Sequence, residues 1–278
     1  MSMRELDLAR TRWLVPANLA ADPILREHLE VVAKQAAGEE IYTVNTRSIY
    51  YTRHPVVGEL AIKELRFESW PRRLRATFTH RHRILCEFRA AIIFEARGGL
   101  LPKPYGAAIE FERGLISRVL IFMDWIPHAR TLTELVRNWS AAQFAEHVPA
   151  LAEFLVSCAD RGLVHGRHSS ENILFSDDRG YQLIDFSHAQ IYSDFNARGF
   201  IHDAARIGSR LLGEDVASRA AVNILFEEIA RAAHKPTVSA ATLARECDWI
   251  MDASKQRQRI KRNVRTFWRG MPFRLRRN

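Results

Sequence analysis

The chain has 278 residues, of which 47% are hydrophobic and 26% are charged, enough apolar content for a sizeable core. This composition excludes an intrinsically disordered protein. No run of about 18 apolar residues occurs, which argues against a membrane-spanning helix, and the N-terminal residues mix acids and bases, as secretory signals do not. We therefore expect a cytoplasmic protein.

The N-terminal part of the sequence predicts a helix followed by strands. Four apolar residues recur at helical spacing after Asp22-Pro23: Leu25, Leu29, Val32 and Ala36. From residue 40 to residue 65 the chain is rich in β-branched and aromatic residues, which predicts three antiparallel strands at 41–44, 48–52 and 60–65. Lys63 lies in the third strand.

A second helix and two further strands are predicted next. Residues 72–96 have helical periodicity, with an apolar stripe of Leu85, Phe88, Ile92 and Ile93, and Glu87 lies on this helix. Glycines and prolines at 98–104 then break the pattern before two strands at 105–112 and 117–124. The chain breaks again at 123–127, around Asp124, where we expect a hinge.

Helical periodicity returns at Thr131 and predicts a long helix over 140–161, which Gly162 ends. Strands at 172–175 and 181–184 then flank a polar turn and predict a β-hairpin. Asn172 begins the first strand and Asp185 follows the second, so two oxygen-bearing side chains converge, as a hard cation such as Mg²⁺ requires. A further helix begins near Phe200 and contains Asp203.

The stretch from His165 to Gln190 resembles the catalytic core of protein kinases, in which the loop H-R-D-x-x-x-x-N is followed by D-F-G. Here the loop runs from His165 to Asn172, and Asp185-Phe186-Ser187 takes the place of D-F-G. Arg167 stands where the family has its catalytic Asp. Only 17 residues separate Asp185 from Asp203, with no A-P-E motif, so a small-molecule or glycolipid acceptor is favoured over a peptide.

The pattern H-G-x-x-x-x-E-N-I-L, with Asp185, Ala189 and Gln190, is similar to the lipopolysaccharide kinase group. These bacterial enzymes phosphorylate heptose or Kdo sugars of the inner core on the cytoplasmic face of the inner membrane. The resemblance implies an α+β, two-lobed protein-kinase-like fold. It implies an N-lobe of residues 1–124 with a lead-in helix, a helical C-lobe of residues 125–252 and a basic tail of residues 253–278.

The same resemblance implies a site for ATP and Mg²⁺. By family position, Lys63 contacts the phosphates, Glu87 holds Lys63 by an ion pair, and Asp124 belongs to the nucleotide site. Asn172 and Asp185 are the implied metal ligands. The implied structural supports are His165, packed beneath the metal motif, and Asp203, which braces the loop. The turn expected to lie over the phosphates, at 45–47, has no G-x-G-x-x-G pattern.

Arg167 leaves several interpretations open. The first is a slow kinase in which positioning and charge neutralisation supply the acceleration. The second is a kinase with His168 as substitute base. The third is a pseudokinase that binds nucleotide and recruits a partner in envelope biogenesis. Arg167 could instead hold a phosphate or carboxylate of the acceptor through a bidentate contact. An atypical small protein kinase is a further alternative.

The net charge of +9 is concentrated near the C-terminal end, because residues 255–278 contain ten Lys or Arg and no acid. Four apolar residues recur among these bases and predict an amphipathic helix over 254–269: Ile260, Val264, Phe267 and Trp268. Such a helix suits an anionic membrane surface, which predicts peripheral association with the inner membrane. Packing on the C-lobe and RNA binding are the alternatives.

A second basic cluster lies at the start of the predicted helix 72–96 and comprises Arg72, Arg73, Arg75, Arg81 and Arg83. Both basic clusters suit the lipopolysaccharide core or another phosphorylated glycolipid as acceptor. We expect no specific nucleic-acid partner.

Overall fold

The computed structural model describes residues 3–8, 11–16, 39–44, 47–54 and 57–270, and the predicted helix around Leu25 to Ala36 lies outside them. The chain forms two compact units. The sheet unit comprises Met1–Leu132, Ser157–Arg167 and Glu171–Asn196, and the helical unit comprises Thr133–Val156, His168–Ser170 and Ala197–Asn278. The expected lobe boundaries at residues 124 and 252 stay a prediction.

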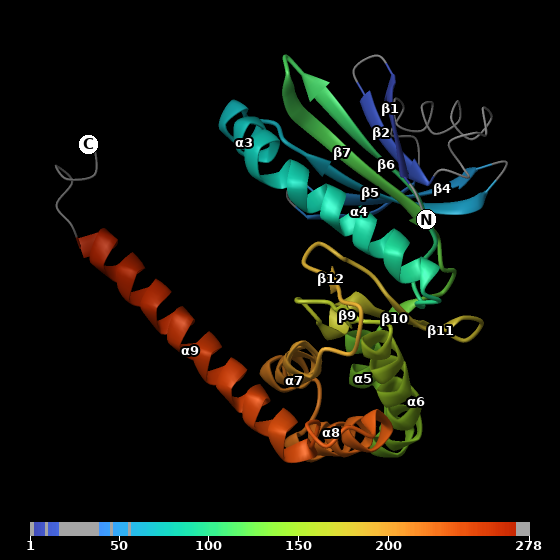
Figure 1. The fold of residues 1–278 in the computed structure, drawn as a ribbon. Coiled ribbons are helices and arrows are strands. Elements are labelled where there is room, and N and C mark those ends of the chain that lie inside the picture. Colours follow the sequence, from blue (N-terminus) through green and yellow to red (C-terminus); the bar gives the residue numbers. More distant parts are fainter. Residues whose placement is uncertain (1–2, 9–10, 17–38, 45–46, 55–56, 271–278) are drawn as a thin grey trace. The chain divides into compact units, whose positions relative to one another are not determined.

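Within the described ranges the sheet unit is built on one seven-stranded antiparallel sheet, in the order β1-β2-β6-β7-β5-β4-β3 (Figure 1). The strands are β1 (Met3–Leu8), β2 (Thr11–Pro16), β3 (Glu39–Val44), β4 (Arg47–His54), β5 (Gly58–Arg66), β6 (Pro104–Glu112) and β7 (Leu115–Asp124). The five strands predicted between residues 41 and 124 are confirmed. The sequence pattern did not predict β1 and β2, which add an edge to the sheet beside β6.

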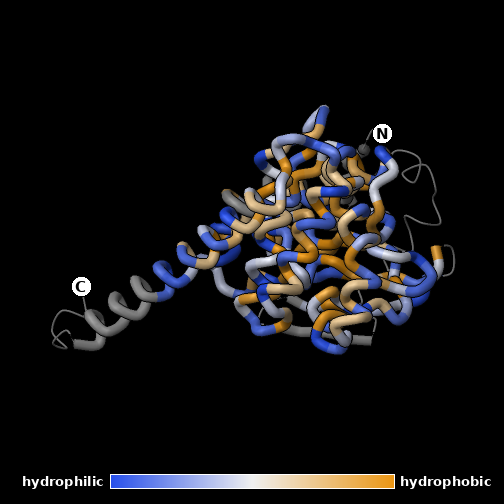
Figure 2. Tube along the Cα trace, turned by 90° about the horizontal axis from the view of Figure 1, so that it is seen from below, coloured by the Kyte–Doolittle hydropathy of each residue, from blue (hydrophilic) through white to orange (hydrophobic). Residues whose placement is uncertain are grey.

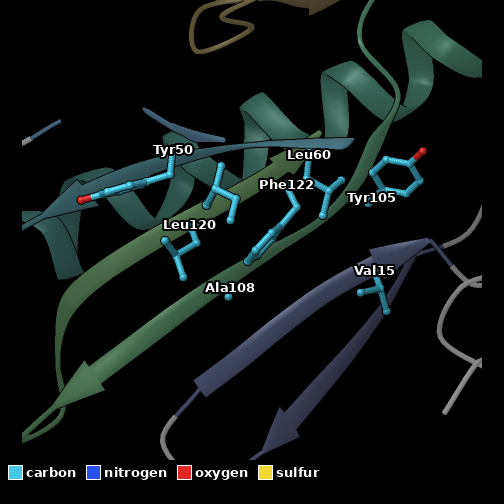
Figure 3. Packing of buried hydrophobic residues seen from close by; sticks show 8 residues of the cluster. Val15, Tyr50, Leu60, Tyr105, Ala108, Leu120 and Phe122 are labelled. Atoms are coloured by element: carbon cyan, nitrogen blue, oxygen red, sulfur yellow. The ribbon is translucent and has the colours of Figure 1, made fainter. Parts of the chain in front are cut away.

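Side chains alternate between the two faces of this sheet, as the pleat requires. One face carries a cluster that includes Tyr50, Leu60, Leu120 and Phe122 (Figure 3). The other face carries Val119 and Ile121 among others, which pack against buried residues of α4 (Arg81–Ala96). Odd-numbered residues near the middle of β5 therefore face α4, and Lys63, opposite Ile121 in the ladder, is one of them.

The predicted helix 72–96 is three consecutive helical segments: α3 (Trp70–Arg75), the π-helix η1 (Ala76–His80) and α4. The predicted apolar stripe is right at Phe88 and Ile92, which are buried, and wrong at Ile93, which is 44% exposed. Ile93 lies one turn after Arg89 and shares its solvent-facing side, because residues four apart lie on one helix face.

Three helices of the helical unit, α7 (Ala197–Gly213), α8 (Arg219–Ala233) and α9 (Ala240–Gly270), pack against one another. Leu211, Leu225 and Leu243 lie fully buried in this packing. The helical backbone of α9 extends through the predicted helix 254–269. Hydrophilic and apolar residues alternate along its described part, as Figure 2 shows.

The remaining elements of the described residues comprise one long helix, α6, and several short elements. They are α5 (Leu132–Asn138), α6 (Ala141–Asp160), β8 (Arg130–Thr131), β9 (Leu163–Val164), the 3-10 turn η2 (Ser170–Asn172), β10 (Ile173–Ser176), β11 (Gly180–Leu183) and β12 (Gln190–Ile191). The predicted hairpin is confirmed by the antiparallel pairing of β10 with β11. Gly162 ends α6 as predicted, with a φ of 80°, and a Cβ there would lie 2.0 Å from the carbonyl oxygen of Tyr192.

Neighbouring positions of α4 give a test of this packing. We expect Ile92→Ala to lower the free energy of unfolding by about 2–5 kcal/mol, because it opens a cavity beneath the sheet. Ile93→Ala makes the same chemical change on the exposed side and should cost about 0.5 kcal/mol or less. Urea unfolding of both variants measures the difference. Equal losses would contradict the assignment of the two helix faces.

Candidate nucleotide site

The ammonium of Lys63 lies between two carboxylates. Its Nζ is 2.7 Å from Oε1 of Glu87 on α4 and 3.1 Å from Oδ1 of Asp185, which follows β11 by two residues. All three residues belong to the sheet unit. The structure therefore brings together one predicted phosphate contact, its predicted ion-pair partner and one predicted metal ligand.

Mutual attraction keeps these groups charged despite their burial. Burial acts to lower the pKa of Lys63, but the nearby Glu87 and Asp185 carboxylates outweigh it and raise that pKa. Burial acts to raise the pKa of Asp185, and the Lys63 ammonium outweighs it, so the pKa of Asp185 is lowered. At neutral pH the cluster thus carries one cation between two anions.

The hairpin places Asp185 next to Asn172. The backbone N–H of Ile184 donates to the carbonyl oxygen of Asn172 at 3.0 Å, which closes the open end of the hairpin. Asn172 in turn donates from Nδ2 to the carbonyl oxygen of Arg167 at 3.1 Å. Asp185 itself has a φ of 62°, in the left-handed region that non-glycine residues seldom occupy. Such backbone strain is typical of functional sites and persists only where the surroundings enforce it.

His165 is fully buried under this segment. Its Nε2–H donates to the carbonyl oxygen of Ile184 at 3.0 Å, and its ring lies 5.6 Å from the ring of Phe186. The adjacent Gly166 has a φ of 72°, and a Cβ there would lie 2.6 Å from the carbonyl oxygen of His188. These contacts tie the loop to the backbone on either side of Asp185, and the structural role of His165 stays a prediction.

The carboxylate of Asp124 is held by two other side chains. Its Oδ1 accepts from the hydroxyl of Tyr105 at 2.6 Å, and its Oδ2 accepts from Nη1 of Arg179 at 3.1 Å. Burial, and then the contact with Asp124, raises the pKa of Tyr105. Asp124 thus links the turn between β10 and β11 to the end of β7. No local pattern pointed to Tyr105 or Arg179, because these contacts join residues 19 and 55 positions from Asp124.

Arg167, which replaces the catalytic Asp, and His168, the predicted substitute base, differ in their surroundings. Arg167 is exposed, and its guanidinium makes no hydrogen bond or ion pair within the described part of the chain. His168, in the helical unit, is 6% exposed, and its Nδ1 is 3.9 Å from Oδ2 of the buried Asp203. Burial, and then the charge of Arg206, lowers the pKa of His168 to about 3. A neutral imidazole with so low a pKa is a weak proton acceptor at pH 7, which counts against His168 as base.

The donor set fits a magnesium ion bound together with phosphates. Asn172 and Asp185 offer amide and carboxylate oxygens, the ligands that Mg²⁺ prefers when waters and phosphate oxygens complete its shell. In the described residues no group of three or more His, Cys, Asp or Glu side chains is placed to hold a metal. A cavity of about 30 Å³ lies among α4, β7 and residues 183–186 and is far too small for a nucleotide base.

Comparison with known proteins identifies the fold. No protein-family model matches the chain, and no curated protein matches it. The structure is similar to the solved structure of WaaP in complex with acyl carrier protein, with a TM-score of 0.55 and 15% sequence identity over 84% of this chain and 96% of that one. The protein has a kinase-like α+β fold. Altogether 1882 solved chains match, so the likeness indicates a fold shared by many proteins and selects no substrate.

The environment of His168 makes a prediction about pH. We expect its imidazole to stay neutral well below pH 6, because the folded pKa lies below the unfolded value of 6.5. Below pH 6.5 the unfolded chain binds a proton at His168 that the folded chain does not bind. The free energy of unfolding is therefore unaffected by His168 above pH 6.5 and decreases below that value, by at most about 1.4 kcal/mol per pH unit. NMR of the ring resonances measures the titration, and His168→Gln assigns the signal. A midpoint near 6.5 would contradict the burial and restore His168 as a base.

Proposed function

We propose that the protein is an ATP-dependent phosphotransferase that acts on a sugar hydroxyl of the lipopolysaccharide inner core. The observation that carries the proposal is the cluster of Lys63, Glu87 and Asp185 within a kinase-like fold. The motif from His165 to Gln190 supports the acceptor class through its resemblance to lipopolysaccharide kinases. The chain shares its fold with WaaP, which was solved in complex with acyl carrier protein.

Each residue of the cluster has a distinct task in this proposal. Lys63 binds the phosphates of ATP, and Glu87 orients the ammonium for that contact. Asn172 and Asp185 hold Mg²⁺, which supplies charge neutralisation on the phosphates. Phosphoryl transfer has a loose transition state, so positioning and charge neutralisation provide most of the acceleration even without a carboxylate base. Arg167, whose guanidinium has no described partner, binds an anionic group of the acceptor.

A nucleotide-binding pseudokinase is the second candidate. It is favoured by Arg167 in place of the catalytic Asp and by the burial of His168, since neither side chain accepts a proton readily at pH 7. This candidate retains the same nucleotide site but transfers no phosphate. Acceptor-dependent turnover therefore distinguishes the two functions.

Asp185 gives the decisive activity test. We expect the parent protein to consume ATP with Mg²⁺ and core-truncated lipopolysaccharide. Asp185→Asn should lower that rate by about 100-fold or more, because it removes the negative charge that binds the metal and pairs with Lys63. Asp177→Asn, an exposed position in the turn of the same hairpin, is the matched control and should keep the parent rate.

The outcomes separate the candidates. Magnesium-dependent ATP binding without phosphate transfer to any core acceptor would select the pseudokinase. If Asp185→Asn binds Mg²⁺-ATP as tightly as the parent, the metal assignment is wrong. Binding is measured with a fluorescent nucleotide, so it does not depend on turnover.

The basic tail extends the proposal to a location at the membrane surface. No helix among the described residues is long and apolar enough to cross a membrane. The helical backbone of α9 nevertheless continues to Gly270 through a sequence that contains seven Lys or Arg from Lys255 onward. We propose that this segment lies on the anionic cytoplasmic face of the inner membrane.

Truncation tests this location. We expect a chain that ends before Lys255 to bind anionic vesicles less than the full-length protein, because about 1 kcal/mol of attraction is lost for each basic residue near the surface. A full-length variant with Lys261, Arg262 and Arg265 replaced by Gln should show a smaller loss in the same direction. Vesicle sedimentation measures both. Equal recovery of the full-length and truncated chains would rule out the tail as a membrane contact.

A further inference from the structure

Two aromatic side chains stand out from the surface of the sheet unit. Trp70 at the start of α3 is 64% exposed, and Phe78 in η1 is 77% exposed. Both belong to one short stretch beside the sheet, where α3 contacts β7 (Figure 1). None of the residues of α3 is buried. Burying such side chains against an apolar partner is favourable, so their shared exposure calls for a physical explanation.

Specific contacts fix this stretch on the sheet. Nε of Arg73 donates to the carbonyl oxygen of Phe67 at 2.7 Å, and Nη1 of Arg73 lies 2.5 Å from Oε2 of Glu112. The hydroxyl of Thr77 donates to the carbonyl oxygen of Arg73 and accepts from the backbone N–H of Ile116. The fold therefore presents Trp70 and Phe78 outward from an anchored support.

The buried side of the same stretch completes the anchor. Ala76, between the two aromatics, is fully buried and belongs to the cluster that includes Phe88 and Ile109. Ala76 of η1 thus packs on the core, while Trp70 and Phe78, which precede and follow it in the sequence, are exposed. A frayed helix end would lack this division.

The segment that carries the aromatics contains bases and no acids, while the nearby Glu68 is exposed and Glu112 pairs with Arg73. From Trp70 to Cys86 the chain has five arginines, two histidines and no Asp or Glu. Arg72 and Arg75 are exposed, as the two aromatics are. We call Trp70, Arg72, Arg75 and Phe78 the α3 patch.

We propose that the α3 patch docks on the surface of an anionic phospholipid bilayer. Aromatic side chains are favoured at the boundary between headgroups and acyl chains, and Trp in particular combines an apolar ring with a polar N–H. Arginine forms bidentate hydrogen bonds with phosphate, the anionic group of phospholipid headgroups. The patch combines both features on an anchored support. The membrane as occupant rests in part on the proposed function, because an inner-core sugar acceptor is carried on a membrane glycolipid.

Vesicle sedimentation of the full chain tests the proposal. The probes are phosphatidylcholine vesicles with and without phosphatidylglycerol. We expect Trp70→Ala/Phe78→Ala to weaken binding to the anionic vesicles by about 10-fold or more, since each large apolar side chain leaves the interface. Leu100→Ala/Ile224→Ala is the matched control, since it removes two apolar side chains that are 46% and 42% exposed elsewhere. This control should bind as the parent does.

The arginines give an independent arm. Arg72→Gln/Arg75→Gln should weaken binding to anionic vesicles and reduce its dependence on salt, and Arg72→Lys/Arg75→Lys should retain most of the binding. The effect of Trp70→Ala/Phe78→Ala should persist in the chain that ends before Lys255, which separates the α3 patch from the tail. Because the aromatics are exposed, thermal unfolding of these variants should match the parent, and Phe78→Trp should bind at least as tightly as the parent.

Several results would overturn the proposal. Equal binding of the parent and Trp70→Ala/Phe78→Ala to anionic vesicles would do so, as would a parent protein that binds no vesicles. Loss of single-stranded RNA binding in this variant, with vesicle binding unchanged, would assign the surface to nucleic acid instead. The vesicle measurement needs no ATP, so a failed kinase assay leaves it intact. Conversely, turnover on a water-soluble core sugar tests the kinase without the membrane.

Discussion

The ammonium of Lys63 joins three segments that are distant in the sequence: strand β5, helix α4 and Asp185, two residues after β11. Taking three charged groups out of water is unfavourable unless each is paired. Here the single cation is shared by two carboxylates, so α4 and the hairpin are both held to β5 by the same atom. Any ligand that binds Lys63 enters a site whose charges are already oriented.

This arrangement makes the side of the site proposed to bind nucleotide better defined than the side proposed to bind the acceptor. Asp185 is fixed by Lys63, by the closed end of the hairpin and by the buried His165 beneath the loop. Arg167 contributes its carbonyl oxygen to Asn172 and leaves its guanidinium without a described partner. A kinase with this constellation depends on positioning and charge rather than on proton abstraction, which is the regime in which loss of the base costs least.

Local patterns in the sequence predicted the parts of the structure that depend on local periodicity. The alternation around Lys63 predicted its strand, and helical spacing placed Glu87 on the facing helix. Three features depended on contacts that no local pattern encodes. Strand β2 pairs with β6, which is distant in the sequence. The carboxylate of Asp124 accepts hydrogen bonds from Tyr105 and Arg179. Ile93 is exposed whereas Ile92 is buried, because consecutive residues point in different directions around α4. The exposure of Trp70 and Phe78 likewise depends on the contacts of Arg73 with Phe67 and Glu112, which the sequence does not predict.

The next residue of β5 strengthens the case that the strand is held rigidly. Glu64 points to the face opposite Lys63 and is 1% exposed, yet it accepts hydrogen bonds from Tyr50, Arg66 and Arg118. Burial acts to raise the pKa of Glu64, and these hydrogen bonds outweigh it and lower that pKa.

Two adjacent residues of opposite charge therefore pin β5 from its two faces, one to α4 and the hairpin, the other to β4 and β7. A strand held in this way cannot slide or rotate without breaking a buried ion pair, because a shift of one residue exchanges the two faces. None of the three side chains that donate to Glu64 is a predicted phosphate contact or metal ligand. The effect of these hydrogen bonds on the site is to fix the backbone from which the Lys63 ammonium projects, which lowers the cost of ordering that side chain when a phosphate binds.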